Sequence, residues 1–133
     1  MTIKKVLVVG SGVMGAGIGQ LCAQQGFDAV ISDINQELAN KAKSNIEKGL
    51  SRRVAKGRIA EEDKNAILFR ISTAGDLSPA SKADFVIESA SENLEIKKNI
   101  FKELDTRVQP EVVLATNTTS LSISAMAEAT TRP

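Results

Sequence analysis

The sequence predicts an α/β fold built on a parallel β-sheet, and three observations support this prediction. Short apolar runs alternate with longer stretches of helical periodicity along the chain. Several runs are apolar at consecutive positions, as expected for strands buried on both faces. The 133 residues have the size of one domain, and 42% hydrophobic with 25% charged residues is ordinary for a globular protein. We therefore expect a single domain over residues 1–133.

The N-terminal part predicts a strand, a helix and a second strand. Residues 3–9 form a near-continuous apolar run that ends at Gly10. A helix is expected over 13–25, with Gly26 as its stop, and a second strand over 29–31. Four apolar residues recur at helical spacing on one side of this helix, which we expect to face the core: Met14, Ile18, Leu21 and Cys22.

The middle of the chain predicts a helical hairpin inserted after the second strand. Residues 36–58 have helical periodicity and contain no proline. Residues 61–70 begin with three acidic residues, which suit a helix N-terminus. The elements expected after this hairpin are strands at 71–73, 84–88 and 112–115 and helices at 93–108 and 122–129.

Composition excludes several functions. The formal net charge is +1 and Trp and Tyr are absent, so we expect no nucleic-acid partner. Cys22 is the only cysteine, which excludes a disulfide framework and a Cys-rich zinc site and indicates a reducing, cytoplasmic location. No run approaches 18 apolar residues, so no membrane span is expected. The chain has no histidine, which excludes an imidazole base within these residues.

A glycine-rich turn follows the first strand and opens the first helix. The segment Gly10-Ser11-Gly12-Val13-Met14-Gly15 is a G-x-G-x-x-G, which is weak alone but specific in this context. The first glycine allows a tight turn, the second lets a pyrophosphate approach the backbone, and the third allows close helix–strand packing. Unpaired amides at the helix N-terminus favour an anion there. The alternative is a turn that binds nothing.

Asp33 ends the second strand, eighteen residues after the last glycine. A carboxylate at this place accepts hydrogen bonds from the ribose hydroxyls of a dinucleotide. It would also repel the 2′-phosphate of NADP, and the next residues, 34–37, contain no Arg or Lys. The turn and Asp33 together predict NAD as the cofactor. We expect two further glycines of the first helix, Gly17 and Gly19, to serve helix–sheet packing.

A stripe of cations lies on the long helix of the hairpin. At 100° per residue, four cations fall within about 80° of one another, beside a separate apolar sector. Such a stripe suits a polyanionic small molecule, although a solvated face would have the same pattern. The cations are Lys41, Lys48, Arg52 and Lys56, and the apolar residues are Ala39, Ala42, Ile46 and Leu50.

Other polar candidates follow the later strands. Ligands of open α/β sheets bind at the carboxyl ends of the strands, where these residues are expected. Glu88 ends a buried strand, either as a site carboxylate or as an acid satisfied by backbone amides. The remaining candidates by position are Glu92, Lys97, Asn117 and Thr119.

Three separated motifs carry a resemblance to a known family. They are the glycine turn, the segment from Val86 to Lys97 (VIESASENLEIK) and the segment from Leu114 to Leu121 (LATNTTSL). The set resembles the N-terminal NAD-binding domain of the 3-hydroxyacyl-CoA dehydrogenases, and among them the bacterial 3-hydroxybutyryl-CoA dehydrogenases. The resemblance covers essentially the whole chain. It implies a Rossmann-like, doubly wound parallel sheet.

The resemblance also implies roles for individual residues. The turn Gly10–Gly15 and Asp33 would bind NAD, and Ala90, Glu92, Lys97 and Asn117 match positions around the nicotinamide half. Arg52 and Lys56 match basic positions of the hairpin that contact coenzyme A. Thr119 stands where the family usually has a serine that contacts the substrate oxygen. Threonine keeps the hydroxyl and adds a methyl group, which could alter the fit of the substrate.

The family's catalytic machinery extends beyond these motifs. Its general base is a histidine in a His-Phe-Phe-Asn-Pro-type segment, expected beyond Pro133. The sixth strand and the helical C-terminal domain, which forms the homodimer and closes over the acyl-CoA, are likewise expected outside this chain. The parent protein would pass hydride between NAD and the 3-hydroxyl of a short acyl-CoA, whereas this chain alone should bind NAD without turnover.

Two other functions stay open at this point. One is a non-catalytic NAD-binding module, and the other is a related dehydrogenase of a free hydroxy acid. Binding of coenzyme A would distinguish both from the acyl-CoA dehydrogenase.

Overall fold

The computed structural model describes residues 3–89 and 94–116. Within this part of the chain, parallel strands form a sheet in the order β3-β2-β1-β4-β5. The chain starts in the middle of the sheet, adds strands to one side and then to the other, which confirms the predicted doubly wound topology. The strands are β1 (Lys5–Val9), β2 (Asp28–Ser32), β3 (Ile71–Ala74), β4 (Phe85–Glu88) and β5 (Val113–Thr116).

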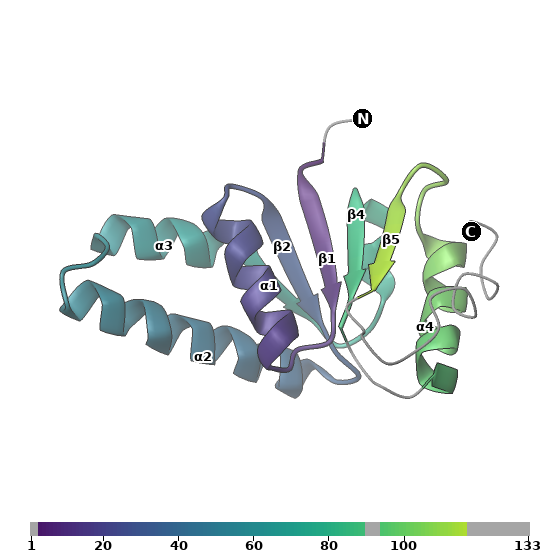
Figure 1. Ribbon diagram of the computed structural model, residues 1–133, viewed down its shortest axis with the longest axis horizontal. Helices are drawn as coiled ribbons and strands as arrows, with labels where there is room; N and C mark the ends of the chain where they lie inside the picture. Colours follow the sequence, from purple (N-terminus) through teal and green to yellow (C-terminus); the bar gives the residue numbers. More distant parts are fainter. Residues whose placement is uncertain (1–2, 90–93, 117–133) are drawn as a thin grey trace.

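Helices cover both faces of the sheet (Figure 1). Helices α1 (Val13–Gln24), α2 (Gln36–Ala55) and α3 (Glu61–Arg70) lie on one face. The short 3-10 helix η1 (Ser78–Lys82) and α4 (Leu94–Arg107) lie on the other. Neighbouring residues of β2 show this division, because Val30 packs with the α4 side and Ile31 with the α1 side. The core therefore consists of two apolar layers separated by the sheet.

Most predicted elements are confirmed, with shifts at their ends. Helix α2 ends at Ala55 rather than at residue 58, because Gly57 adopts a φ of 72° that no helix contains. Gly26 has a φ of 97° and ends α1 as predicted. The 3-10 helix η1 was not predicted, and the predicted helix at 122–129 lies outside the described residues.

The buried side of α1 differs from the prediction. Its buried residues are Gly15, Gly19 and Ala23, whereas Met14 and Leu21 are 60% and 57% exposed. The reason is close packing, because a Cβ on Gly15 would lie 1.9 Å from the carbonyl oxygen of Gly10. The helix therefore rests on the sheet through its smallest residues, and larger side chains point away.

Two smaller predictions on α1 have mixed outcomes. Gly19 does pack on the sheet, since an added Cβ would lie 2.8 Å from Ile31 Cδ1. The same prediction was wrong for Gly17, which is exposed and where an added Cβ would meet nothing within 4 Å. Cys22 is half-buried rather than part of the core, and this burial raises the pKa of its thiol.

Helix α2 has the two faces that its sequence predicts. Its apolar sector is buried and includes Ile46 and Leu50. The cation stripe of Lys41, Lys48, Arg52 and Lys56 is exposed. The side chain of Asn35 caps the helix by accepting a hydrogen bond of 2.9 Å from the Leu38 amide. This cap begins α2 directly after the carboxyl end of β2.

Candidate functional site

The glycine turn lies at the carboxyl edge of the sheet, between β1 and α1. Gly10 has a φ of 109°, a conformation that favours glycine, and its amide donates to the Ser32 carbonyl at 2.7 Å. Gly12 is the N-cap of α1, and among the described residues no side chain caps this helix end. The first amides of α1 are therefore left to a ligand or to solvent. This arrangement suits an anion such as a pyrophosphate.

Asp33 is hydrogen-bonded to this turn. Its Oδ2 accepts a hydrogen bond of 2.9 Å from the Ser11 amide and a second from the Ser11 hydroxyl. Its Oδ1 accepts from the Ile34 amide at 2.7 Å. Partial burial raises the pKa of Asp33, but these three hydrogen bonds outweigh it and hold the pKa below its ordinary value of 3.8. Asp33 is thus an ionised acceptor next to the turn.

Two hollows flank the turn, and Asp33 borders both. A cavity of about 310 Å³ lies on the α4 side of the sheet. Its walls combine apolar side chains, including Leu77 and Ile100, with the carboxylates of Asp76 and Glu103. A groove of about 650 Å³ runs between α1 and α2, lined by Gly17, Gln20, Lys41 and Asn45 among others. Three wall residues, Asp76, Leu77 and Ile100, were not predicted. Asp76 and Leu77 directly precede η1, which no sequence pattern indicated, and Ile100 of α4 reaches the cavity only in the assembled fold.

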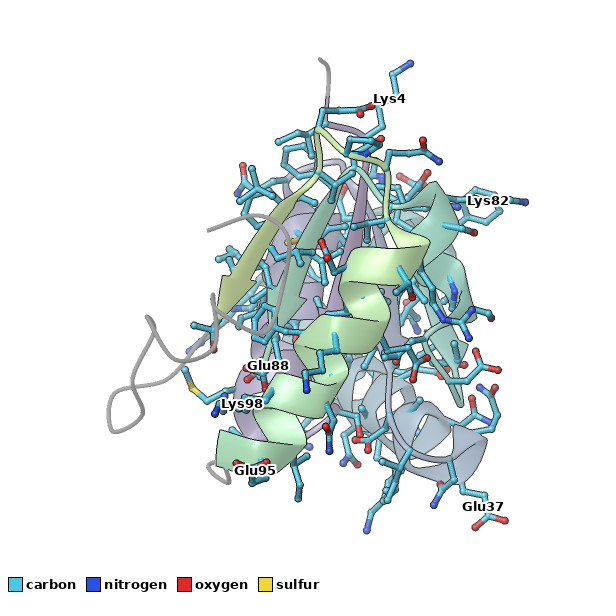
Figure 2. All side chains as sticks on the ribbon, turned by 90° about the vertical axis from the view of Figure 1, so that its right-hand side faces the viewer. Lys4, Glu37, Lys82, Glu88, Glu95 and Lys98 are labelled. Atoms are coloured by element: carbon cyan, nitrogen blue, oxygen red, sulfur yellow. The ribbon has the colours of Figure 1, made fainter. Side chains whose placement is uncertain are left out.

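Glu88 forms a buried ion pair at the other end of the site. Its Oε1 accepts hydrogen bonds from Lys97 Nζ at 2.6 Å and from Thr116 Oγ1 at 2.7 Å. The side chains of Glu88 and Lys97 are 0% and 1% exposed. These two partners are side chains, whereas the sequence suggested either a site carboxylate or an acid satisfied by backbone amides. In Figure 2, Glu88 lies at the lower ends of β4 and β5, beside the start of α4.

The structure brings some predicted site residues together and leaves others apart. Ser11, Gly12, Val13 and Asp33 line the same groove. Arg52 borders a separate hollow on α2, and Lys56 follows the last residue of that helix. Met14 is exposed in the first turn of α1, and Lys97 of α4 is bound to Glu88 at the end of β4. The predicted residues Ala90, Glu92, Asn117 and Thr119 lie outside the described residues.

The described residues contain neither a candidate metal site nor a candidate membrane span. No group of three His, Cys, Asp or Glu residues there could hold a metal ion. The helices in this part of the chain lack the combination of length and hydrophobicity that a membrane-spanning helix needs.

The strand order, the glycine turn and Asp33 together define a dinucleotide-binding domain of the Rossmann type. The family model described as "3-hydroxyacyl-CoA dehydrogenase, NAD binding domain" matches residues 5–133. The chain belongs to this family, as its NAD-binding domain.

Individual relatives agree with this assignment. A 3-hydroxybutyryl-CoA dehydrogenase of Bradyrhizobium diazoefficiens is 41% identical over 98% of the chain, which spans 45% of that protein. A 3-hydroxyadipyl-CoA dehydrogenase of Escherichia coli is 39% identical over 96% of the chain and 27% of the protein. The crystal structure of (S)-3-hydroxybutyryl-CoA dehydrogenase from Ralstonia eutropha superimposes with a TM-score of 0.94 at 37% identity, covering 98% of this chain and 46% of that one. The chain thus spans less than half the length of these relatives.

Proposed function

We propose that the chain binds NAD across the carboxyl edge of the sheet, through Gly10–Gly15 and Asp33. The amides of the turn would hold the pyrophosphate, and the Asp33 carboxylate would accept the hydroxyls of the adenosine ribose. The cavity on the α4 side suits the adenine, because it adjoins Asp33 and offers the apolar sides of Leu77 and Ile100 to a flat base. The observation that carries the proposal is the hydrogen bonding of Asp33 to the turn.

The other half of NAD would then extend over β4 and β5, because the adenosine half lies over β2. The resemblance implies that Ala90, Glu92, Lys97 and Asn117 surround the nicotinamide there. Bound NAD supplies the acceptor or donor of a hydride. The residues of this chain bind and orient the cofactor. The whole protein is proposed to be a 3-hydroxyacyl-CoA dehydrogenase acting on a short acyl-CoA such as 3-hydroxybutyryl-CoA.

The acyl-CoA part of the proposal is supported by α2. Its exposed cations and the hollow beside Lys48 and Arg52 suit the phosphates of coenzyme A. Arg52, Lys56 and Thr119 are the proposed substrate contacts. We further propose that the whole protein is cytoplasmic and forms a homodimer through its C-terminal domain.

Calorimetric titration of the 133-residue chain with NADH tests the cofactor proposal. We expect saturable binding, and no heat at millimolar NADH would overturn it. The same chain should not oxidise NADH with acetoacetyl-CoA, because it contains no histidine to act as the base that the resemblance implies. Turnover at an enzyme-like rate would contradict this assignment of the base.

Titration with coenzyme A tests the substrate proposal separately. The double variant Arg52→Ala/Lys56→Ala should weaken this binding about tenfold or more, since two phosphate contacts are lost. Lys102→Ala is the matched control, because Lys102 is an exposed cation of α4 on the opposite face of the sheet. Equal losses in both variants would indicate nonspecific attraction. Absence of any coenzyme A binding would favour a plain NAD-binding module or a dehydrogenase of a free hydroxy acid.

A further inference from the structure

The ion pair of Glu88 and Lys97 joins three elements at one point. Glu88 is the last residue of β4, and its register partner in β5 is Thr116, the last residue of that strand. Lys97 comes from the N-terminal part of α4. Because Lys97 and Thr116 donate to the same oxygen of Glu88, the ends of β4 and β5 and the start of α4 are held to one another.

Burial of the Glu88–Lys97 ion pair costs desolvation free energy, which makes the pair an inefficient way to add stability alone. Two charges removed from water gain little net stability from their attraction, and well-packed apolar side chains often serve as well. A carboxylate oxygen that accepts two short hydrogen bonds does, however, fix the positions of both donors within narrow limits. The contact is therefore better suited to setting geometry than to adding stability.

The hydrogen bonds of Glu88 lie at the ends of β4 and β5, where the nicotinamide half of NAD is proposed to bind. Asp33 marks the adenosine half over β2, so the remaining half extends over β4 and β5. The residue after Glu88 is also tied to this edge, since the Ser89 amide donates to the Val9 carbonyl at 2.7 Å. Thr116 immediately precedes Asn117, a proposed nicotinamide contact.

We propose that Glu88 is a positioning residue for the nicotinamide half of the cofactor and acts through Lys97 and Thr116. The proposal rests on NAD binding as described above. It assigns Glu88 no contact with the cofactor. Its effect should therefore be confined to ligands that contain nicotinamide and should be absent from ligands that contain only the adenosine diphosphate ribose part.

The experiment compares NADH and ADP-ribose on the full chain. Thr116→Val removes one hydrogen bond and keeps the side-chain shape, and Glu88→Gln removes the charge. We expect NADH affinity to fall about threefold to tenfold in Thr116→Val and at least tenfold in Glu88→Gln, with ADP-ribose affinity changed less than twofold. The fluorescence of bound NADH should also shift toward that of the free cofactor. Thr106→Val, which removes an exposed hydroxyl near the other end of α4, is the control.

Double variants test whether Glu88 acts through Lys97. The loss of NADH affinity caused by Glu88→Gln should shrink when it is measured in a Lys97→Met background, because the partner is already gone. Equal losses in the two backgrounds, or equal losses of NADH and ADP-ribose, would overturn the proposal. If Glu88→Gln does not fold, the Thr116→Val comparison decides by the same criterion. Failure of the unmodified chain to bind even ADP-ribose would instead overturn the proposed NAD site.

Discussion

The carboxylate of Asp33 accepts hydrogen bonds from both the backbone amide and the hydroxyl of Ser11, twenty-two residues earlier in the chain. The end of β2 is thereby joined to the turn between β1 and α1. A second link reinforces it, since the Gly10 amide donates to the Ser32 carbonyl at 2.7 Å. The proposed pyrophosphate and ribose contacts are therefore parts of one preorganised structure, which lowers the cost of ordering them on binding.

Asp33→Ala should weaken NADH binding about tenfold and narrow the preference for NADH over NADPH. The variant removes the proposed ribose acceptor and the negative charge that would repel a 2′-phosphate. Titration with both cofactors measures the two effects. Asp28→Ala is the matched control, because Asp28 is an exposed carboxylate at the other end of β2 and should leave both affinities unchanged. Equal affinity of the unmodified chain for NADH and NADPH would contradict the role given to Asp33.

Gly15→Ala and Gly17→Ala should have opposite effects on stability. A Cβ at Gly15 would lie 1.9 Å from the backbone oxygen of Gly10, so the start of α1 must shift away from the glycine turn. We expect a loss of roughly 2–4 kcal/mol in the free energy of unfolding. At Gly17 an added Cβ meets nothing within 4 Å. Alanine there should raise the free energy of unfolding by up to about 1 kcal/mol, because its helix propensity is higher than that of glycine. Urea unfolding measures both, and a tolerated Gly15→Ala would refute the close packing.

Local patterns predicted most of the fold, because buried strands and amphipathic helices have distinct periods. The prediction that Met14 and Leu21 lie on the buried side of α1 was wrong. It followed from their hydrophobicity, which is greater than that of glycine. The closest contacts of α1, however, leave no room for a side chain at Gly15 or Gly19. The glycine motif and Asp33 could be found because their spacing is short and regular. The partners of Glu88 could not, because Lys97 and Thr116 reach it only once β4, β5 and α4 are assembled.

Asp84 should make the stability of the chain fall in acid. Its Oδ2 accepts hydrogen bonds of 2.8 and 2.9 Å from the amides of Lys4 and Lys5, and these bonds hold its pKa below the ordinary value of 3.8. A depressed pKa contributes stability that is complete above the unfolded value and is lost as the pH falls through the folded value. The contribution should therefore be constant from pH 7 to about 5, begin to decrease near the ordinary value of 3.8, and be lost only at lower pH.

The melting temperature of the chain between pH 3 and pH 7 checks this expectation. Asp84→Asn should lower the melting temperature at pH 7 and show a smaller further decrease in acid. Asp33 also has a depressed pKa and contributes in the same direction, so part of the acid effect should persist in the variant. An unchanged acid profile in Asp84→Asn would show that these hydrogen bonds do not couple to folding.

Ser32→Ala should raise the stability of the chain. Ser32 is 0% exposed, and its hydroxyl has no hydrogen-bond partner among the residues that the structure describes. An unsatisfied buried hydroxyl costs about 1–3 kcal/mol, whereas a methyl group in its place needs no partner. We expect a gain of about 1 kcal/mol in the free energy of unfolding, measured with urea. Ser72→Ala on β3, where the serine is exposed, should change it by less than about 0.5 kcal/mol. A loss of stability in Ser32→Ala would mean that the hydroxyl finds a partner in solution, such as a water molecule at the cavity that Ser32 borders.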